Sequence, residues 1–197
     1  IIAPETAVDG LPIRTPVVDI ASVGAGGGSI VWRDTGGMLR VGPRSSGADP
    51  GPACYRRGGT APTITDAHVI RGTIQAQSLL GGRMQLDATA ARAVFAPLAA
   101  EFAMSVEQIA DSAIRLADAN VVRAIQLIST ELGRDPRDYV LVPFGGAGPL
   151  HAGRIAEDLG IATIVVPPNA GVLSAGGLLA SDYTQYDPVT RKVPLDA

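Results

Sequence analysis

Two glycine-rich segments are the parts of this 197-residue sequence best suited to bind an anion. The first runs from position 24 to 29, and the second from position 144 to 148, where it opens a predicted helix. Backbone amides that carry no bulky side chains can converge on a phosphate, and a helix N-terminus adds partial positive charge. We therefore expect phosphate or nucleotide contacts from these residues: Gly24, Ala25, Gly26, Gly27, Gly28, Ser29, Gly145, Gly146, Ala147 and Gly148. Tight turns also use runs of glycine, so the spacing alone leaves that alternative open.

The second segment matches neither of the two common nucleotide-binding loops. His151 stands where a dinucleotide fingerprint would need its third glycine, and no lysine follows to make a Walker A loop. Any nucleotide site here is therefore of another kind.

Three aspartates are candidates for metal binding or catalysis. Asp19 ends a predicted strand and could hold Mg²⁺, directly or through water, or simply cap a turn. Asp49 is a catalytic candidate, although its Ala-Asp-Pro-Gly context is typical of a turn. Asp66 could serve an active site, but with Thr65 it is more typical of a helix cap.

The two histidines and the single cysteine carry weaker signals. His151 falls in the first turn of the helix after the second glycine segment, so it is either a polar contact to a nucleotide or a packed helix residue. His68 is more typical of a surface residue than of a ligand, and Cys54 is more typical of a loop thiol than of a nucleophile, which would need a base beside it. No spacing of His, Cys and Asp predicts a zinc site.

Composition excludes several classes of protein. Hydrophobic residues make up 46% of the sequence, which is too many for a disordered chain. The net charge is −3 without a basic stripe, so we expect no nucleic-acid partner, and the apolar runs are too short to span a membrane. One cysteine makes no disulfide framework, which favours a reduced, cytoplasmic compartment. Because the sequence starts at Ile1 without methionine, we interpret it as a piece of a longer protein.

The elements that position the first glycine segment are strands. A short buried strand is predicted over Pro16–Ile20, before the glycines. After them, alternating residues predict a β-hairpin with its turn at Asp34–Gly37. A long loop follows over 42–63, and residues 65–80 are ambiguous, with a short helix as one interpretation.

Two helices follow. The first is predicted over Ala88–Phe102, with Asp87 as its N-cap and a kink or break at Pro97. The second begins with a capping box made by Ser105 and Gln108 and ends at Gly133. Its apolar residues form one stripe: Val106, Ile109, Ala113, Ala117, Val121, Ala124, Ile128 and Leu132.

The last third alternates strands and helices. Buried strands are predicted at Tyr139–Val142 and Thr163–Val166, with a helix from Pro149 to Leu159 between them. A further helix is expected over Gly171–Ala180. Short connections in this order predict a parallel pair of strands and an α/β fold.

Two glycine turns that each follow a strand resemble the acetate/sugar kinase, heat-shock and actin superfamily. Its second lobe holds phosphates with a glycine-rich hairpin and lays a later Gly-Gly turn against adenosine. The resemblance implies that 16–63 is the phosphate hairpin with its loop, that 84–133 is a helical insertion in a mixed sheet, and that 138–182 is the adenosine side.

A narrower resemblance is to the hydantoinase A/5-oxoprolinase family, which also contains ketone carboxylase subunits. It rests on six short motifs, which occur in order across most of Pro16–Asp182: VGAGGGS (23–29), RVGP (40–43), GADPGPACY (47–55), PTITDA (62–67), FGGAGPLHA (144–152) and GVLSA (171–175). It implies that 1–197 is one partial domain, and that the parent protein uses ATP and Mg²⁺ to hydrolyse a cyclic amide such as a hydantoin, 5-oxoproline or a lactam. The alternatives are an ATP-using subunit of an acetone- or acetophenone-type carboxylase, and a non-catalytic nucleotide-binding scaffold.

The sequence departs from the family in two ways. The family's Asp-x-His-Thr reads Asp-Ile-Ala-Ser at 19–22, so Ala21 stands in place of the histidine. The family's N-terminal Asp-x-Gly-Gly-Thr phosphate loop is absent from the sequence. We therefore expect a second subunit or another lobe to complete the site, and the chain alone to be a poor catalyst.

Overall fold

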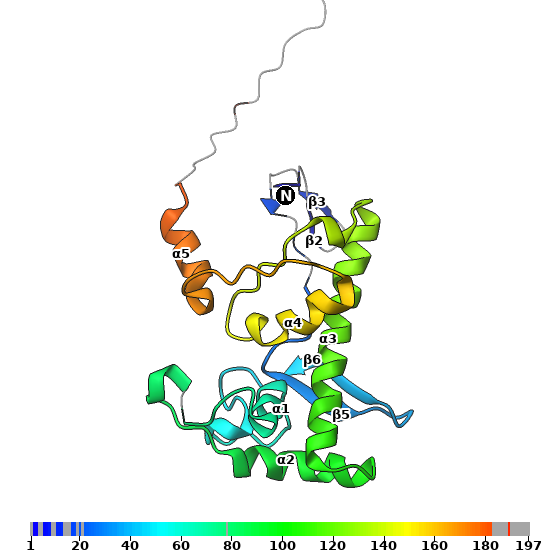
Figure 1. Ribbon diagram of the computed structural model, residues 1–197, viewed down its shortest axis with the longest axis vertical. Helices are drawn as coiled ribbons and strands as arrows, with labels where there is room; N and C mark the ends of the chain where they lie inside the picture. Colours follow the sequence, from blue (N-terminus) through cyan, green and yellow to red (C-terminus); the bar gives the residue numbers. More distant parts are fainter. Residues whose placement is uncertain are drawn as a thin grey trace, which may run out of the picture.

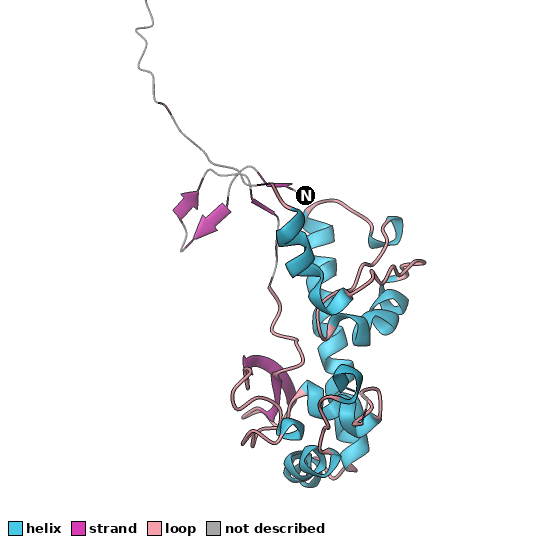
Figure 2. Cartoon of the chain, turned by 90° about the vertical axis from the view of Figure 1, so that its left-hand side faces the viewer, coloured by secondary structure: helices cyan, strands magenta, loops and turns pink. Residues whose placement is uncertain are grey.

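The longest helix, α3 (Val106–Glu131), runs through the structure and carries other elements along its length (Figure 1). The structure is a computed structural model that describes residues 2–3, 6–8, 11–13, 17–18, 20, 22–77, 79–182 and 189. Helices α1 and α2 and the β5–β6 hairpin pack at the N-terminal end of α3, and α4 packs farther along it. Figure 2 shows the β5–β6 hairpin on one side of this column of helices, at its lower end.

The predicted hairpin is confirmed as β5 (Ser29–Arg33) and β6 (Leu39–Ser45), paired antiparallel with Val31 opposite Val41. Its turn is closed by Asp34, whose side chain accepts from the Met38 amide at 2.8 Å. Gly37 adopts a φ of 82°, which a residue with a Cβ rarely reaches. β5 begins at Ser29, so the hairpin follows the first glycine segment directly.

Four short strands precede the hairpin. β1 (Ile2–Ala3) pairs antiparallel with β4 (Val17–Val18), and β2 (Thr6–Val8) pairs antiparallel with β3 (Leu11–Ile13). The strand predicted at 16–20 is thus present as β4, while Asp19 and Ala21 lie outside the described residues.

The ambiguous segment after the long loop contains helix α1 (Ile64–Arg71). Thr63 caps it, and the Thr63 hydroxyl and the Asp66 carboxylate form a capping box. The loop before it holds a short 3-10 turn, η1 (Ala53–Tyr55), and a second such turn, η2 (Leu79–Gly82), follows α1. Asp66 is therefore a helix-capping residue, as its context favoured.

Both long predicted helices are confirmed. α2 (Ala88–Glu101) has Asp87 as its N-cap and continues across Pro97 without a break. α3 has the predicted capping box of Ser105 and Gln108. It ends at Leu132, and Gly133 follows with a φ of 62°. The left-handed residue after the last turn is the usual way in which a glycine terminates a helix.

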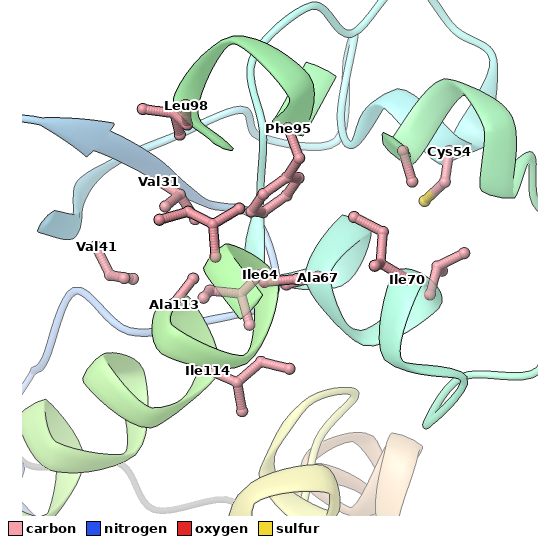
Figure 3. Packing of buried hydrophobic residues seen from close by; sticks show 14 of the residues in the cluster. Val31, Val41, Cys54, Ile64, Ala67, Ile70, Phe95, Leu98, Ala113 and Ile114 are labelled. Atoms are coloured by element: carbon pink, nitrogen blue, oxygen red, sulfur yellow. The ribbon is translucent and has the colours of Figure 1, made fainter. Parts of the chain in front are cut away.

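The hydrophobic core lies where α1, α2, the N-terminal half of α3 and the hairpin meet. Figure 3 shows Phe95 of α2 and Ile64 of α1 packed between Val31 of β5 and Ala113 of α3, and both Phe95 and Ile64 are fully buried. The helices predicted as an insertion at 84–133 thus carry a large part of the core.

The last third contains η3 (Pro136–Asp138), α4 (Gly148–Leu159), η4 (Ala170–Val172) and α5 (Leu173–Ala180). The predicted parallel pairing is present as a single bridge between Leu141 and Ile164. The prediction that these strands are buried is wrong for this chain, because Val140, Val142, Val165 and Val166 are all exposed. Their apolar side chains meet no further layer among the described residues.

No single described helix is long and apolar enough to cross a membrane. The α2–α3 pair would suffice in combined length and composition, but it is bent by 90°.

Candidate functional site

The first glycine segment is a turn closed on the hydroxyl of Ser29. The Gly26 amide donates to Ser29 Oγ at 2.9 Å, and Ser29 Oγ donates to the Gly24 carbonyl at 3.2 Å. The backbone of Gly24 passes so close to Pro43 that a Cβ would lie 2.9 Å from the proline Cα. The side chain of Ser29 is thus committed to shaping the turn, which leaves backbone amides to face a ligand.

Helix α1 holds this turn from the other side. The Thr65 amide and the Thr65 hydroxyl both donate to the Gly27 carbonyl, at 2.8 and 2.9 Å. A Cβ on Gly27 would lie 2.8 Å from Thr65 Oγ1, so glycine is needed for this close approach. The N-terminus of α1 therefore fixes the position of the first glycine segment.

The second glycine segment leads into α4. Gly145 has a φ of 79°, and its amide donates to the Ala170 carbonyl at 2.8 Å. Ala147 is the N-cap of α4 and makes no side-chain capping bond. Pro149 has no amide N–H, and the Leu150 amide donates to the Ala147 carbonyl at 3.0 Å. In the first turn of α4, the Gly148 amide is therefore the one that donates to no backbone carbonyl among the described residues, and it can face an anion.

Both glycine segments line one cavity of about 580 Å³. Gly27 and Gly28 border it on one side and Gly146 and Ala147 on the other, and a Cβ on Gly27 would lie 3.8 Å from that of Ala147. The wall also includes Arg57. Other polar or hydrophobic side chains complete it: Ser45, Tyr55, Thr65, His68, Ile74, Met84, Leu86 and Leu150. Segments more than 100 residues apart in the chain thus form opposite walls of one site.

The structure does not bring Asp49, one of the two predicted catalytic carboxylates, to this cavity. Asp49 is exposed and is not part of the wall, where its neighbour Ala48 stands. Asp19 lies outside the described residues, so its predicted role in metal binding and catalysis stays a prediction. Among the described residues, no group of three or more His, Cys, Asp or Glu side chains could hold a metal ion.

Asp66 and Cys54 have structural roles. Asp66 is fully buried and accepts from the Cys54 amide at 2.8 Å, the Ala53 amide at 3.3 Å and the Thr63 hydroxyl at 2.7 Å. The Cys54 thiol is fully buried, and burial, followed by the nearby Asp66 charge, raises its pKa well above the ordinary value. A thiol that stays protonated is not a nucleophile.

The two histidines meet below the cavity, in a buried cluster with Asp118 of α3. His151 Nδ1 lies 2.5 Å from Asp118 Oδ1, and the Nε2 atoms of His151 and His68 are 3.4 Å apart. His68 is 2% exposed and His151 5% exposed, so the expectation that His68 lies on the surface is wrong. The segment that was ambiguous in sequence folds as a capped helix and turns His68 inward. Both ring nitrogens of His151 face partners within the protein, Asp118 and His68. A direct contact between His151 and a nucleotide stays a prediction.

Sequence analysis missed Asp118, and Arg57 and Tyr55 in the cavity wall. A signal for Asp118 was available: it continues the buried column of Ala110 and Ile114 at four-residue spacing. A carboxylate on the buried face of a helix needs a partner, and the partners here are His151 and Arg154, the latter at 3.5 Å.

Comparisons with known proteins agree on the family. The family model described as Hydantoinase/oxoprolinase matches residues 1–187. The chain is 42% identical to caprolactamase subunit alpha of Pseudomonas jessenii over 179 residues, covering 90% of the chain and 26% of that protein. It is 37% identical to 5-oxoprolinase 1 of Arabidopsis thaliana over 198 residues, covering 92% of the chain and 16% of the relative. It thus spans about a quarter or less of the length of these relatives.

A solved structure adds the fold. The nucleotide-free acetone carboxylase superposes with a TM-score of 0.85 at 30% identity, covering 93% of this chain and 26% of that one. The predicted α/β class and actin-like ATPase fold are confirmed by this likeness and by the solved caprolactamase structure. Four of the six motifs that carry the family resemblance contribute residues to the cavity wall: VGAGGGS, GADPGPACY, PTITDA and FGGAGPLHA. The family model covers nearly the whole chain, and the chain belongs to the hydantoinase/oxoprolinase family.

Proposed function

We propose that this chain forms part of the nucleotide site of an ATP-dependent cyclic-amide hydrolase, of the hydantoin, 5-oxoproline or lactam type. The observation that carries the proposal is the single cavity between Gly27–Gly28 and Gly146–Ala147. The similarity to an ATP-dependent caprolactamase and to a 5-oxoprolinase supports the choice of reaction.

The residues present fit a nucleotide. A volume of about 580 Å³ lies within the range of small-molecule sites. Among the described residues, the amides of Gly27, Gly28 and Gly146 donate to no backbone carbonyl, so all three can bind an anion. Arg57 adds a positive charge to the wall, and the N-terminus of α4 adds partial positive charge.

These groups would act by stabilising negative charge. ATP, when bound, would supply the phosphoryl group that, once transferred to the amide oxygen, activates the amide carbon toward attack by water. The chain's own contribution is a fixed set of amides and one guanidinium, which offset the charge on the phosphates without reorganising. The described residues provide no carboxylate cage for Mg²⁺, so we assign it no ligand among them, and Asp19 stays the predicted one. Its use together with ATP stays a prediction, because Mg²⁺ in nucleotide sites is often held mainly by phosphates and water.

Calorimetric titration with Mg·ATP and Mg·ADP tests the proposal. Gly146 offers a clean variant, because a Cβ there meets nothing within 4 Å. Gly146→Asp would place a carboxylate in the cavity, and we expect nucleotide affinity to fall at least tenfold. Gly177→Asp makes the same change on α5, also in open space, and should leave affinity unchanged. Equal affinity in both variants, or no binding by the folded protein, contradicts the proposal.

A second candidate is an ATP-using subunit of a ketone carboxylase, which the TM-score of 0.85 with acetone carboxylase favours. Steady-state ATP hydrolysis separates the two. Stimulation by lactams or 5-oxoproline supports the hydrolase, whereas stimulation by a ketone with bicarbonate supports the carboxylase. Nucleotide binding without turnover on either, measured with the second subunit present, would identify a non-catalytic scaffold.

A partner chain is part of the proposal. Caprolactamase subunit alpha is by its name one subunit of an assembly, and the exposed valines around the Leu141–Ile164 bridge give this chain an apolar surface to cover. We expect the protein to purify with a second subunit and to act in the cytoplasm. We expect no nucleic-acid or membrane partner.

A further inference from the structure

The buried cluster of Asp118, His151 and His68 joins three helices in one hydrogen-bonded line. Asp118 belongs to α3, His151 to α4 and His68 to α1. The distances are 2.5 Å from Asp118 Oδ1 to His151 Nδ1 and 3.4 Å between the two Nε2 atoms. The imidazole rings meet edge to face with their centroids 4.9 Å apart. Each of the three side chains is at most 5% exposed, so the line is closed to bulk water.

The hydrogen bonds assign a direction to the protons. A carboxylate accepts, so His151 donates from Nδ1 to Asp118 and, when neutral, presents a lone pair on Nε2. His68 then donates from Nε2 to that lone pair. The remaining nitrogen, His68 Nδ1, is an acceptor, and it is the one buried side-chain atom with no partner among the described residues. A buried polar atom left without a partner is uncommon and points to a group that is still to bind.

The position of His68 relates this line to the ligand cavity. His68 is part of the wall of the glycine-lined cavity and also of a smaller polar cavity of about 320 Å³ beside Asp118 and Arg154. Leu150 lines both cavities as well. Nδ1 itself is buried beneath the cavity surface, so a ligand would reach it only after a small movement of the wall.

Burial is the main reason that His68 is neutral near pH 7. Burial, and then the neighbouring His151, lower its pKa to about 4, with a smaller contribution from Arg71 and an opposing one from Asp118. Arg71 is itself paired with Asp111 at 2.6 Å, and Arg154 lies 3.5 Å from Asp118. Geometry offers a way onward for a proton that arrives at His68, because its Nε2 lies 3.4 Å from His151 Nε2 and His151 Nδ1 lies 2.5 Å from Asp118.

We propose that His68 is a general base of this site, and that His151 and Asp118 are positioning residues that accept the charge it takes up. The proposal rests on the proposed function, because the proton comes from the N–H of the bound cyclic amide. As the amide oxygen forms its bond to the phosphorus and the bond from phosphorus to the ADP oxygen breaks, the N–H proton passes to His68 Nδ1. The Nε2 proton of His68 then passes to His151 Nε2, which leaves an imidazolium against the Asp118 carboxylate. The amide becomes a neutral imidate phosphorylated on oxygen, and atoms and charge balance.

Kinetics of the His68→Gln variant test the role of His68. Glutamine keeps a polar group in place but cannot pass a proton on. We expect lactam-dependent turnover to fall about 100-fold or more, the usual effect of losing a general base, with nucleotide affinity within about twofold of wild type. In His68→Gly, added imidazole should restore part of the turnover, which a purely structural role would not explain. Nucleotide binding with unchanged turnover in His68→Gln would overturn the inference alone, whereas loss of nucleotide binding by the wild type would overturn the proposed function.

A second test uses the wild-type chain, so it does not require any variant to fold. The sequence contains only two histidines, so ¹⁵N-detected NMR of the imidazoles resolves two rings. We expect His151 to carry its proton on Nδ1 and His68 to carry its proton on Nε2 at neutral pH. A proton on His68 Nδ1 would overturn the inference, because that atom could then accept nothing.

Discussion

The Nε2 atoms of His68 and His151 lie 3.4 Å apart, although 83 residues separate them in the chain. The contact exists because α1 and α4 each pack on α3, which supplies Asp118 as the third member. Helices α1 and α4, which border the ligand cavity, are therefore linked by a buried contact between two ionisable side chains. The first prediction concerns the effect of pH on this contact.

Acidification should destabilise the chain through His68. Its pKa falls from 6.5 to about 4 on folding because of burial and His151, so the folded state binds fewer protons between these values. The stability from a neutral His68 is complete above pH 6.5 and is lost as the pH drops toward 4. From pH 7 to pH 5, the free energy of unfolding should decrease by about 2 kcal/mol more in wild type than in His68→Gln. Urea unfolding at the two pH values measures this, and equal decreases would show that His68 does not change its pKa on folding.

Close packing of the first glycine segment on α1 predicts a steric difference between neighbouring glycines. A Cβ on Gly27 would lie 2.8 Å from Thr65 Oγ1, whereas one on Gly26 meets nothing within 4 Å. Gly27→Ala should therefore destabilise the chain by about 1–3 kcal/mol, as other overpacking changes do, and weaken nucleotide binding. Gly26→Ala is the matched control and should be close to neutral in thermal unfolding. Equal melting temperatures for the two variants would mean that Thr65 moves aside freely.

Replacement of Asp66 should loosen the loop before α1. Its carboxylate accepts bonds from the amides of Ala53, Cys54 and Thr63 as well as from the Thr63 hydroxyl. Asp66→Asn puts an amide donor against these donors, so we expect a loss of about 2–4 kcal/mol in the free energy of unfolding. Cys54 should also become reactive toward a thiol reagent, because the turn that buries it is released. A Cys54 that stays protected in a destabilised Asp66→Asn chain would show that the core alone buries the thiol.

The N-cap of α3 should contribute about 1 kcal/mol to the free energy of unfolding. Ser105 Oγ accepts from the Gln108 amide at 3.1 Å, and Gln108 Oε1 accepts from the Ser105 amide at 2.8 Å. Ser105→Ala removes the first bond and should lower stability by that amount in urea unfolding. Ser112→Ala is the control within the same helix, since Ser112 Oγ bonds only to the carbonyl one turn before it. An Ser112→Ala variant as destabilised as Ser105→Ala would argue against a specific effect of the cap.

Local signals in the sequence were enough for most of the helices. Ser105 with Gln108, Asp87 before α2, and Gly133 and Gly160 after α3 and α4 each act within one turn of the backbone, so their neighbours in sequence determine the outcome. The hairpin around Asp34 was predictable for the same reason.

Features that depend on distant segments were not predictable in this way. His68 looks like a surface residue by its neighbours, and only the packing of α4 brings His151 to it. The apolar runs around Leu141 and Ile164 predicted buried strands, and this was wrong for the chain, because an apolar run does not say which segment covers a strand. The shared cavity also arises from packing, since its two glycine walls meet only in the folded chain.

Helix α3 has a consequence for how a ligand would bind. With 26 residues it is about 39 Å long, and it contacts both α1, which holds Gly27 through Thr65, and α4, which begins beside Ala147. Both walls of the cavity therefore belong to elements that pack on the same helix, and neither has to become ordered when a nucleotide binds. Such preorganisation lowers the entropic cost of association, so affinity can be high even where each amide contributes little.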